Sequence, residues 1–223
     1  MHELNLDVPW SIGEKAFEGI CNELEFNNPK KIFEFGSGVS SIRFAQQFPL
    51  AQIYCLDHEQ RFAKRTQKLA LLHNINPNRF FIESMPLKWQ RYGITWYLTY
   101  AVSNFPQDID VVIIDGPPAR TRRGREACLY QIERSLRIGG VVFLDDLYRI
   151  DEHRIAQNWM MRYGDYFDYS VIRRGHGLLK MTKRKNSGRF SSPITVIADN
   201  FIINLIQFYI KPIAKSFLKP FIC

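Results

Sequence analysis

Short apolar runs of strand length alternate with amphipathic stretches along the chain as far as Thr182. The apolar runs stop at a glycine or an acidic residue, whereas the stretches between them repeat their hydrophobic positions with helical spacing. The runs predict strands over Lys31–Phe35, Gln52–Leu56, Arg79–Ile82, Asp110–Ile114 and Gly139–Leu144. The amphipathic stretches predict helices over Ile12–Phe26, Ser41–Phe48, Arg61–His73, Arg123–Arg137 and Asp151–Tyr163.

Strands that alternate with helices in this way predict a doubly wound, mainly parallel sheet with helices on both faces. Two further β-rich runs, Tyr166–Ile172 and Leu178–Thr182, flank a Gly-His-Gly turn and predict an antiparallel hairpin that completes a seven-stranded sheet. The aromatic stretch Met85–Gln107 shows no clear period, so we expect an irregular loop there.

Two polar residues are predicted to begin helices. Ser11 followed by Glu14 fits a capping box, in which each side chain satisfies a free amide of the first turn. Asp151 is predicted to cap the helix that follows it.

The C-terminal segment differs from the rest of the chain in charge and pattern. Residues 183–223 carry +6 of the net charge of +8, which leaves +2 for residues 1–182. We expect an α/β domain over 1–182, a basic linker over 183–193 and an amphipathic helical tail over 194–223, kinked at Pro212 and Pro220. Apolar bulk with lysines suits an anionic lipid surface, a second copy of the chain or the chain's own domain, and the tail is too interrupted for a transmembrane span.

Composition narrows the class of protein. A nearly neutral body lacks the broad basic face of a nucleic-acid enzyme, so no nucleic-acid partner is expected. The four cysteines form no CxxC pair, which disfavours a zinc site or a disulfide framework and suits a reducing compartment. The opening sequence MHELNLDVPW does not resemble a secretory signal, so we expect a cytoplasmic protein, with the inner membrane surface as the site that the tail would reach.

The glycine-rich turn after the first strand is the most informative segment. Gly36-Ser37-Gly38 lies between a strand and a helix, where the backbone can approach a ligand and helix N–H groups point at it. Glu34 precedes this turn, and a carboxylate there suits a ligand with an ammonium group rather than a pyrophosphate. Asp57 ends the second strand, and its spacing from Gly38 places an acid against ribose hydroxyls.

Three acids follow the fourth and fifth parallel strands. Asp115, Asp145 and Asp146 stand at the carboxyl ends of strands, where open α/β sheets bind their ligands. Carboxylates so placed can bind a divalent cation such as Mg²⁺, which would lower the pKa of a coordinated hydroxyl. Without a metal, Asp115 could act as the general base or orient the acceptor, and Asp145 or Asp146 could cap the next segment.

The motifs EFGSGVSS, CLDHE, VVIIDGPP and GGVVFLDDLYR resemble those of class I S-adenosylmethionine-dependent methyltransferases, with a Rossmann-like fold over about residues 10–182. EFGSG, IDGP and LDD are most similar to a branch that includes bacterial small-molecule and plant glucuronoxylan O-methyltransferases. This resemblance implies that Glu34 and the turn Gly36-Ser37-Gly38 bind the methionine part of the donor and Asp57 its ribose. It also implies that His58 and Ser84 lie against adenine.

The acids are similar in layout to the metal site of catechol-type O-methyltransferases. The chain departs from that family at Gly116-Pro117-Pro118, where the family has a loop with a lysine, and this leaves the use of metal open. Four arginines stand where a helix is expected to begin, and cations oppose the dipole there: Arg120, Arg122, Arg123 and Arg125. Arg120 and Arg122 are the predicted acceptor-binding residues. An acidic acceptor would compensate them, although a solvated loop would explain them equally well.

The sequence therefore predicts an O-methyltransferase for a sugar-like or other small hydroxylated acceptor. Three alternatives stay open at this point. A nicotinamide dinucleotide could occupy the glycine turn, since Ser41 stands where its fingerprint has a third small residue. A nucleic-acid methyltransferase is disfavoured by charge, and a non-catalytic nucleotide-binding scaffold anchored by its tail is disfavoured by the acids after the fourth and fifth strands.

Overall fold

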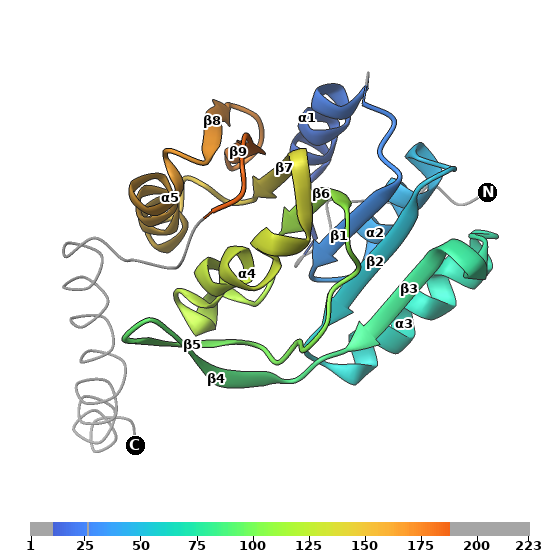
Figure 1. Cartoon of the computed structure of the whole chain (residues 1–223). Coiled ribbons are helices and arrows are strands. Elements are labelled where there is room, and N and C mark those ends of the chain that lie inside the picture. The colour runs from blue at the N-terminus through green and yellow to red at the C-terminus, as the bar shows by residue number, and fades with distance from the viewer. Residues whose placement is uncertain (1–10, 26, 188–223) are drawn as a thin grey trace, which may run out of the picture.

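A seven-stranded sheet with helices on both faces forms the body of the molecule (Figure 1). The computed structural model describes residues 11–25 and 27–187. The strands of the main sheet, in chain order, are β1 (Lys31–Phe35), β2 (Gln52–Asp57), β3 (Phe80–Ser84), β6 (Ile109–Ile114), β7 (Leu136–Leu144), β8 (Phe167–Ile172) and β9 (Leu178–Lys183). The helices are α1 (Glu14–Leu24), α2 (Val39–Gln47), α3 (Gln60–Leu72), α4 (Gly124–Ile132) and α5 (Ile150–Tyr163), with 3₁₀ turns at Pro77–Arg79, Ala119–Thr121 and Glu133–Ser135.

The strand order is β3-β2-β1-β6-β7-β9-β8, and the first five strands in that order run parallel. Strand β9 pairs antiparallel with both β7 and β8, so the predicted hairpin closes the sheet. The predicted fold class, a mainly parallel seven-stranded sheet with an antiparallel hairpin, is confirmed.

Alternate residues of the central strands supply two separate cores. Ile32 and Ile113 pack with apolar side chains of α1, α2 and α3 on one face. Phe33 and Ile114 pack with α4 and α5 on the other face. Because β1 and β6 are buried on both faces, their sequences are largely apolar, as expected for parallel strands in the middle of such a sheet.

Helix α4 is shorter than the sequence pattern indicated. It ends at Ile132, and a 3₁₀ turn leads into β7, which begins at Leu136 rather than Gly139. The predicted helix to Arg137 was therefore wrong. Leu136 is buried and pairs with Ile109 of β6. Strand β7 therefore gains a buried apolar side chain and a strand-pairing position, both of which a longer helix would lose.

Both predicted helix caps were also wrong. Gly13 is the N-cap residue of α1 and has no side-chain capping bond, while Glu14 forms a two-pronged ion pair with Arg43 of α2 at 2.8 and 3.0 Å. Helix α5 begins at Ile150, so Asp151 lies inside its first turn and not at the cap. In both cases an arginine from another element competes for the carboxylate.

The stretch that we expected to be irregular contains a second sheet. Strands β4 (Leu87–Tyr92) and β5 (Thr95–Tyr100) pair antiparallel through a two-residue turn at Gly93 and Ile94. Gly93 has a φ of +65°, which a glycine adopts without strain. Figure 1 shows this hairpin in green lying beside α4. It replaces the expected loop between β3 and β6.

At its C-terminal end the domain includes Lys183, one residue beyond the predicted boundary, as the buried last residue of β9. The predicted tail over 194–223 and most of the predicted linker lie outside the described residues. Among the helices that are described, none is long and apolar enough to cross a membrane.

Candidate functional site

The glycine turn after β1 lies against the segment that follows β6. Gly36 has a φ of +121°, and its amide donates to the carbonyl of Leu56 at 3.1 Å. A side chain at Gly36 would meet the backbone nitrogen of Gly116 at 3.5 Å in this strained conformation. Gly38 precedes α2, and its amide donates to the hydroxyl of Ser41 at 3.2 Å. The turn therefore presents backbone rather than side chains beside Gly116.

Glu34 is buried directly behind this turn. Its two carboxylate oxygens accept hydrogen bonds from Ser40 at 2.6 Å and from Ser41 at 2.5 Å, both in the first turn of α2. Burial raises the pKa of Glu34 to about 7, although these two hydrogen bonds oppose the shift. The carboxylate thus fixes α2 to the end of β1 and places a titratable group beneath the glycines.

Asp57 closes the same edge from β2. One oxygen of its carboxylate accepts from the Ser37 hydroxyl at 3.0 Å, and the other accepts from the backbone amide of Glu59 at 2.9 Å. The ring nitrogen Nδ1 of His58 lies 3.3 Å from Asp57, and Ser84 stands opposite Asp57 in the β2–β3 register. Thus the residues predicted to bind the donor gather along the carboxyl ends of β1, β2 and β3.

The three predicted acids also come together. Asp115, which follows β6, and Asp145 and Asp146, which follow β7, each place a carboxylate oxygen within 4.8 Å of the others. The backbone amide of Asp115 donates to the carbonyl of Phe35 at 3.1 Å, so the acid cluster adjoins the glycine turn. The carboxyl ends of adjacent parallel strands bring this about, as the sequence predicted.

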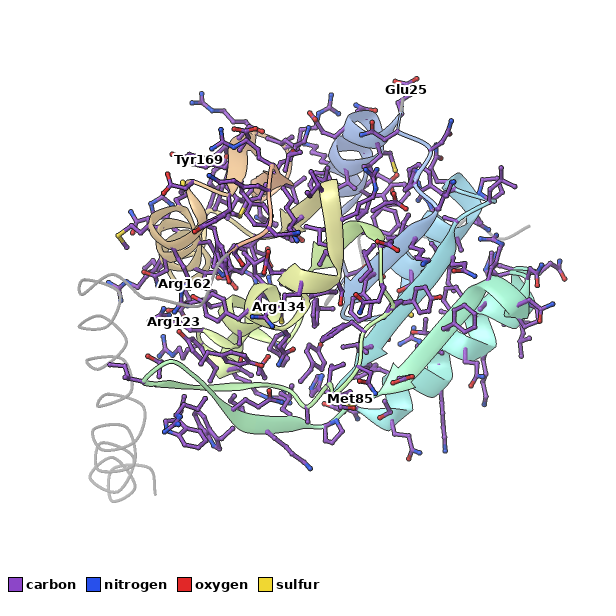
Figure 2. All side chains as sticks on the ribbon, in the orientation of Figure 1. Glu25, Met85, Arg123, Arg134, Arg162 and Tyr169 are labelled. Carbon is purple, nitrogen blue, oxygen red and sulfur yellow. The ribbon has the colours of Figure 1, made fainter. Side chains whose placement is uncertain are left out.

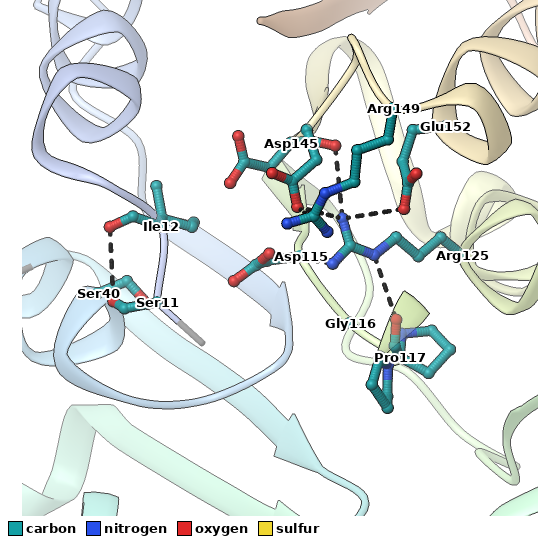
Figure 3. Close-up of polar contacts among 12 residues, drawn as sticks. Ser11, Ile12, Ser40, Asp115, Gly116, Pro117, Arg125, Asp145, Arg149 and Glu152 are labelled. Carbon is teal, nitrogen blue, oxygen red and sulfur yellow. Dashed lines mark hydrogen bonds and ion pairs between the residues drawn. The ribbon is translucent and has the colours of Figure 1, made fainter. Parts of the chain in front are cut away.

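One of the four arginines at the expected helix start, Arg125, is buried among these acids, which are its compensating partners in place of an acceptor. The Arg125 side chain extends from the first turn of α4 toward the acids, as Figure 3 shows. Its guanidinium lies 3.3 Å from Asp115, 3.3 Å from Asp146 and 3.5 Å from Glu152. Arg149 adds a second cation, 2.6 Å from Asp146. The cluster is therefore a mixed network of four acids and two arginines.

Burial raises the pKa values of two members of this cluster. The pKa of Asp145 rises to about 7, because burial and the neighbouring Asp115 and Asp146 carboxylates outweigh Arg125. The pKa of Asp115 is also raised, mainly by burial, while Arg125 acts in the opposite direction. Oδ1 of Asp145 is buried and has no hydrogen-bond partner among the residues that the structure describes.

The arginines predicted to bind the acceptor lie at the rim of this edge. Arg120 is in the 3₁₀ turn before α4, is 66% exposed, and reaches Nε2 of His58 at 3.0 Å. Arg122 is 43% exposed and lies 3.5 Å from Asp151. Both remain accessible, but each already lies close to a polar group of the protein. An acceptor is therefore not needed to explain them.

Arg123 has a different environment from its neighbours. It pairs with Glu126, which is buried where the β4–β5 hairpin, α4 and α5 meet. Glu126 also accepts from the hydroxyls of Tyr97 at 2.9 Å and Tyr130 at 2.6 Å. Figure 2 shows Arg123 on this side of the molecule, beside the hairpin. This network attaches the hairpin to the helices and is separate from the acid cluster.

Three solved methyltransferases have folds similar to that of this chain. A putative O-methyltransferase from Klebsiella pneumoniae is 14% identical with a TM-score of 0.59, and the match covers 80% of this chain and 84% of that chain. A methyltransferase from Podospora anserina solved with S-adenosylhomocysteine is 12% identical with a TM-score of 0.58, covering 77% and 80%. The O-methyltransferase TomG from Streptomyces achromogenes, in complex with S-adenosylmethionine, is 14% identical with a TM-score of 0.56, covering 80% and 84%.

This chain has the Rossmann-like fold of class I methyltransferases. No protein-family model and no curated protein matches the sequence. In this fold, the glycine turn and Asp57 stand at the carboxyl ends of β1 and β2, and the acid cluster stands at those of β6 and β7. The predicted Rossmann-like fold is thereby confirmed.

Proposed function

We propose that the protein is an S-adenosylmethionine-dependent O-methyltransferase acting on a small hydroxylated acceptor. One observation carries the proposal: the glycine turn with its acids and the Asp115 cluster share one edge of the sheet, joined by the hydrogen bond from Asp115 to Phe35. This arrangement supports a donor site beside a general base or cation site. Two solved methyltransferases with this fold, 12% and 14% identical to this chain, hold the product or the donor.

The chain's own groups account for donor binding. Backbone amides at the start of α2 can receive the carboxylate of the methionine part, and so can the Gly38 amide if the Ser41 hydroxyl gives way. Asp57 can accept hydrogen bonds from ribose hydroxyls if the Ser37 hydroxyl gives way, and Glu34 provides negative charge below an ammonium group. His58 and Ser84 border the place where adenine would lie.

Asp115 is the residue that we assign to the acceptor. It is partly accessible, it ends the strand beside β1, and Arg125 contacts only one of its oxygens in the described structure. Its carboxylate can accept the proton of an acceptor hydroxyl, or hold that hydroxyl in line with the sulfonium methyl group. The raised pKa of Asp115 is consistent with a group that takes up a proton.

The cluster also fits a divalent cation. With all four acids ionised and both arginines charged, Asp115, Asp145, Asp146, Glu152, Arg125 and Arg149 together carry a net charge of −2. Hard oxygen ligands suit Mg²⁺ or Mn²⁺, and so does Oδ1 of Asp145, which lacks a partner within the described residues. Asp115, Asp145 and Asp146 would hold such an ion, which when bound lowers the pKa of a coordinated hydroxyl.

The rim favours an acceptor with an acidic group, such as a uronic acid or a phosphorylated sugar. Arg120, Arg122 and Arg149 are 66%, 43% and 51% exposed at the carboxyl edge, which leaves their guanidinium groups able to exchange partners. Guanidinium groups bind carboxylate and phosphate oxygens in two-pronged geometry. We therefore propose Arg120 and Arg122 as acceptor-binding residues.

Two measurements on the full chain test this function: calorimetry for ligand binding and an assay of methyl transfer. We expect S-adenosylmethionine and S-adenosylhomocysteine to bind, NAD to bind at least ~10-fold more weakly, and methyl transfer to a panel of hydroxylated acids to follow. Tighter binding of NAD would favour the dinucleotide alternative. Donor binding without transfer to any acceptor, with or without Mg²⁺, would instead favour a non-catalytic scaffold.

A further inference from the structure

Arg125 connects the loop after β6, the loop after β7 and helix α5. Its Nε donates to the carbonyl of Pro117 at 3.2 Å, and its terminal nitrogens reach the carbonyl of Asp145 at 3.4 Å and the carboxylates of Asp115, Asp146 and Glu152. The side chain is only 5% exposed. All of its described polar contacts are therefore to the loops that carry the proposed site and to α5.

The position of the charge has a direct electrostatic consequence. An arginine 3.3 Å from two of the three acids already does part of what a bound metal would do, because it offsets their mutual repulsion. Removing it would change the net charge of the cluster from −2 to −3. An arginine cannot lose its proton at ordinary pH, so this compensation is permanent.

We propose that Arg125 is a positioning residue that serves as a resident cation of the acid cluster. It holds one oxygen of Asp115 and one of Asp146, and it limits the charge with which the cluster attracts an external cation. The inference rests on the proposed function, since it assigns the cluster a part in methyl transfer. Arg125 itself is not placed in contact with the donor or the acceptor.

Arg123 provides a matched control two positions earlier in the chain. The Arg123 side chain is 4% exposed and that of Arg125 is 5% exposed, and both pair with carboxylates, but Arg123 pairs with Glu126 beneath the hairpin. Replacing either arginine leaves buried acids without their cation and should lower stability to a similar extent. Only Arg125→Met changes the charge beside Asp115 and Asp146, so the two variants separate stability from the role proposed here.

The experiment measures Mn²⁺ binding by electron paramagnetic resonance on the full chain. It compares wild type, Arg125→Met, Arg125→Lys and Arg123→Met, with S-adenosylhomocysteine affinity of each protein as a second readout. We expect Arg125→Met to bind Mn²⁺ ~10-fold or more tightly, because the cluster loses a repelling charge. Arg125→Lys keeps the charge and should stay within about 3-fold of wild type, as should Arg123→Met. If Arg125→Met does not fold, Arg125→Gln replaces it.

Each outcome decides the proposal. Tighter Mn²⁺ binding in Arg125→Met, including binding gained where wild type shows none, supports the resident-cation role. Unchanged or weaker binding in Arg125→Met, or the same change in Arg123→Met, overturns it and leaves Arg125 a structural residue. Failure of wild type to bind S-adenosylhomocysteine would instead contradict the proposed function, and that readout does not depend on Mn²⁺.

Discussion

The β1–β2 half of the carboxyl edge and the β6–β7 half hold their acids by different means. Glu34 and Asp57 accept hydrogen bonds from serine hydroxyls and a backbone amide supplied by nearby residues of the chain. Asp115 and Asp146 are held by arginine guanidinium groups instead. Neutral donors leave negative charge in the first half, which suits a cationic sulfonium donor. Arginines offset two of the four negative charges of the second half, and the exposed arginines at its rim are the part proposed to bind an acidic acceptor.

A third region, beneath the hairpin, shows how the fold treats a buried acid that lies apart from the proposed site. Glu126→Ala should lower the free energy of unfolding by about 3–5 kcal/mol, because it leaves the buried Arg123 guanidinium without its carboxylate. Chemical denaturation measures this. Glu18→Ala removes an exposed ion pair with Arg174 and should change stability by less than about 1 kcal/mol. If Glu126→Ala lowered stability no more than Glu18→Ala, the Glu126 network would not stabilise the domain.

The β6–β7 half, which holds the proposed acceptor residue Asp115, should control turnover without controlling donor affinity. Asp115→Asn should lower methyl transfer by a factor on the order of 100 or more, because the amide cannot take up the acceptor proton. Transfer of a radiolabelled methyl group to the best acceptor of the panel measures this. Asp168→Asn, an exposed acid of β8, serves as the control. Full activity in Asp115→Asn would remove Asp115 from the reaction.

Donor affinity in the β1–β2 half should depend on pH through Glu34. Since burial raises its pKa to about 7, the carboxylate should ionise between about pH 6 and 8, and the ammonium group of the ligand should favour the ionised form. Affinity for S-adenosylhomocysteine should therefore rise by ~10-fold from about pH 6 to about pH 8 and stay flat in Glu34→Gln. A flat profile in wild type would contradict the assignment.

The same group has an opposite effect on stability. An acid whose pKa is raised by folding favours the folded state below its unfolded pKa, and this contribution is lost as pH rises toward about 7. Without ligand, wild type should therefore lose stability relative to Glu34→Gln between about pH 4.5 and 7. Thermal melts across this range provide the comparison.

The two halves also differ in how well the sequence predicted them. In the β1–β2 half, EFGSG and Asp57 follow directly from the ends of adjacent strands, so the sequence was enough to predict that these residues lie together. The positions of Asp115, Asp145 and Asp146 followed from strand ends. The partners of these acids did not, because Arg125, Arg149 and Glu152 reach them only after α4 and α5 have packed.

The hairpin shows a different limit. Its buried face is not an apolar stripe, because Gln90 and Thr99 lie on the same side as Tyr97 and Tyr92, and their polar groups pair with α4 or with the hairpin itself. Strict hydrophobic alternation is therefore missing. The available signal was Gly93 between two β-rich runs, which is typical of a two-residue turn.

Residues 194–223 should matter least to the donor site. We expect deletion of residues 186–223 to leave S-adenosylhomocysteine affinity within about 2-fold, because every proposed donor residue precedes Met85. The deletion should abolish either binding to anionic vesicles or self-association, which vesicle flotation and light scattering distinguish. Lipid binding should weaken with salt, since charges are screened over about 10 Å at 0.1 M. A truncated protein that does not fold would contradict both the lipid-binding and the self-association hypotheses.

Calorimetric titration of S-adenosylhomocysteine into wild type, Asp57→Ala and Asp115→Asn tests the division between the two halves most directly. Asp57→Ala should weaken binding by about 1–3 kcal/mol, because buried ribose hydroxyls lose their acceptor. Asp115→Asn should bind within about 2-fold of wild type, since its carboxylate is assigned to the acceptor. Unchanged affinity in Asp57→Ala, or an equal loss in Asp115→Asn, would contradict the account.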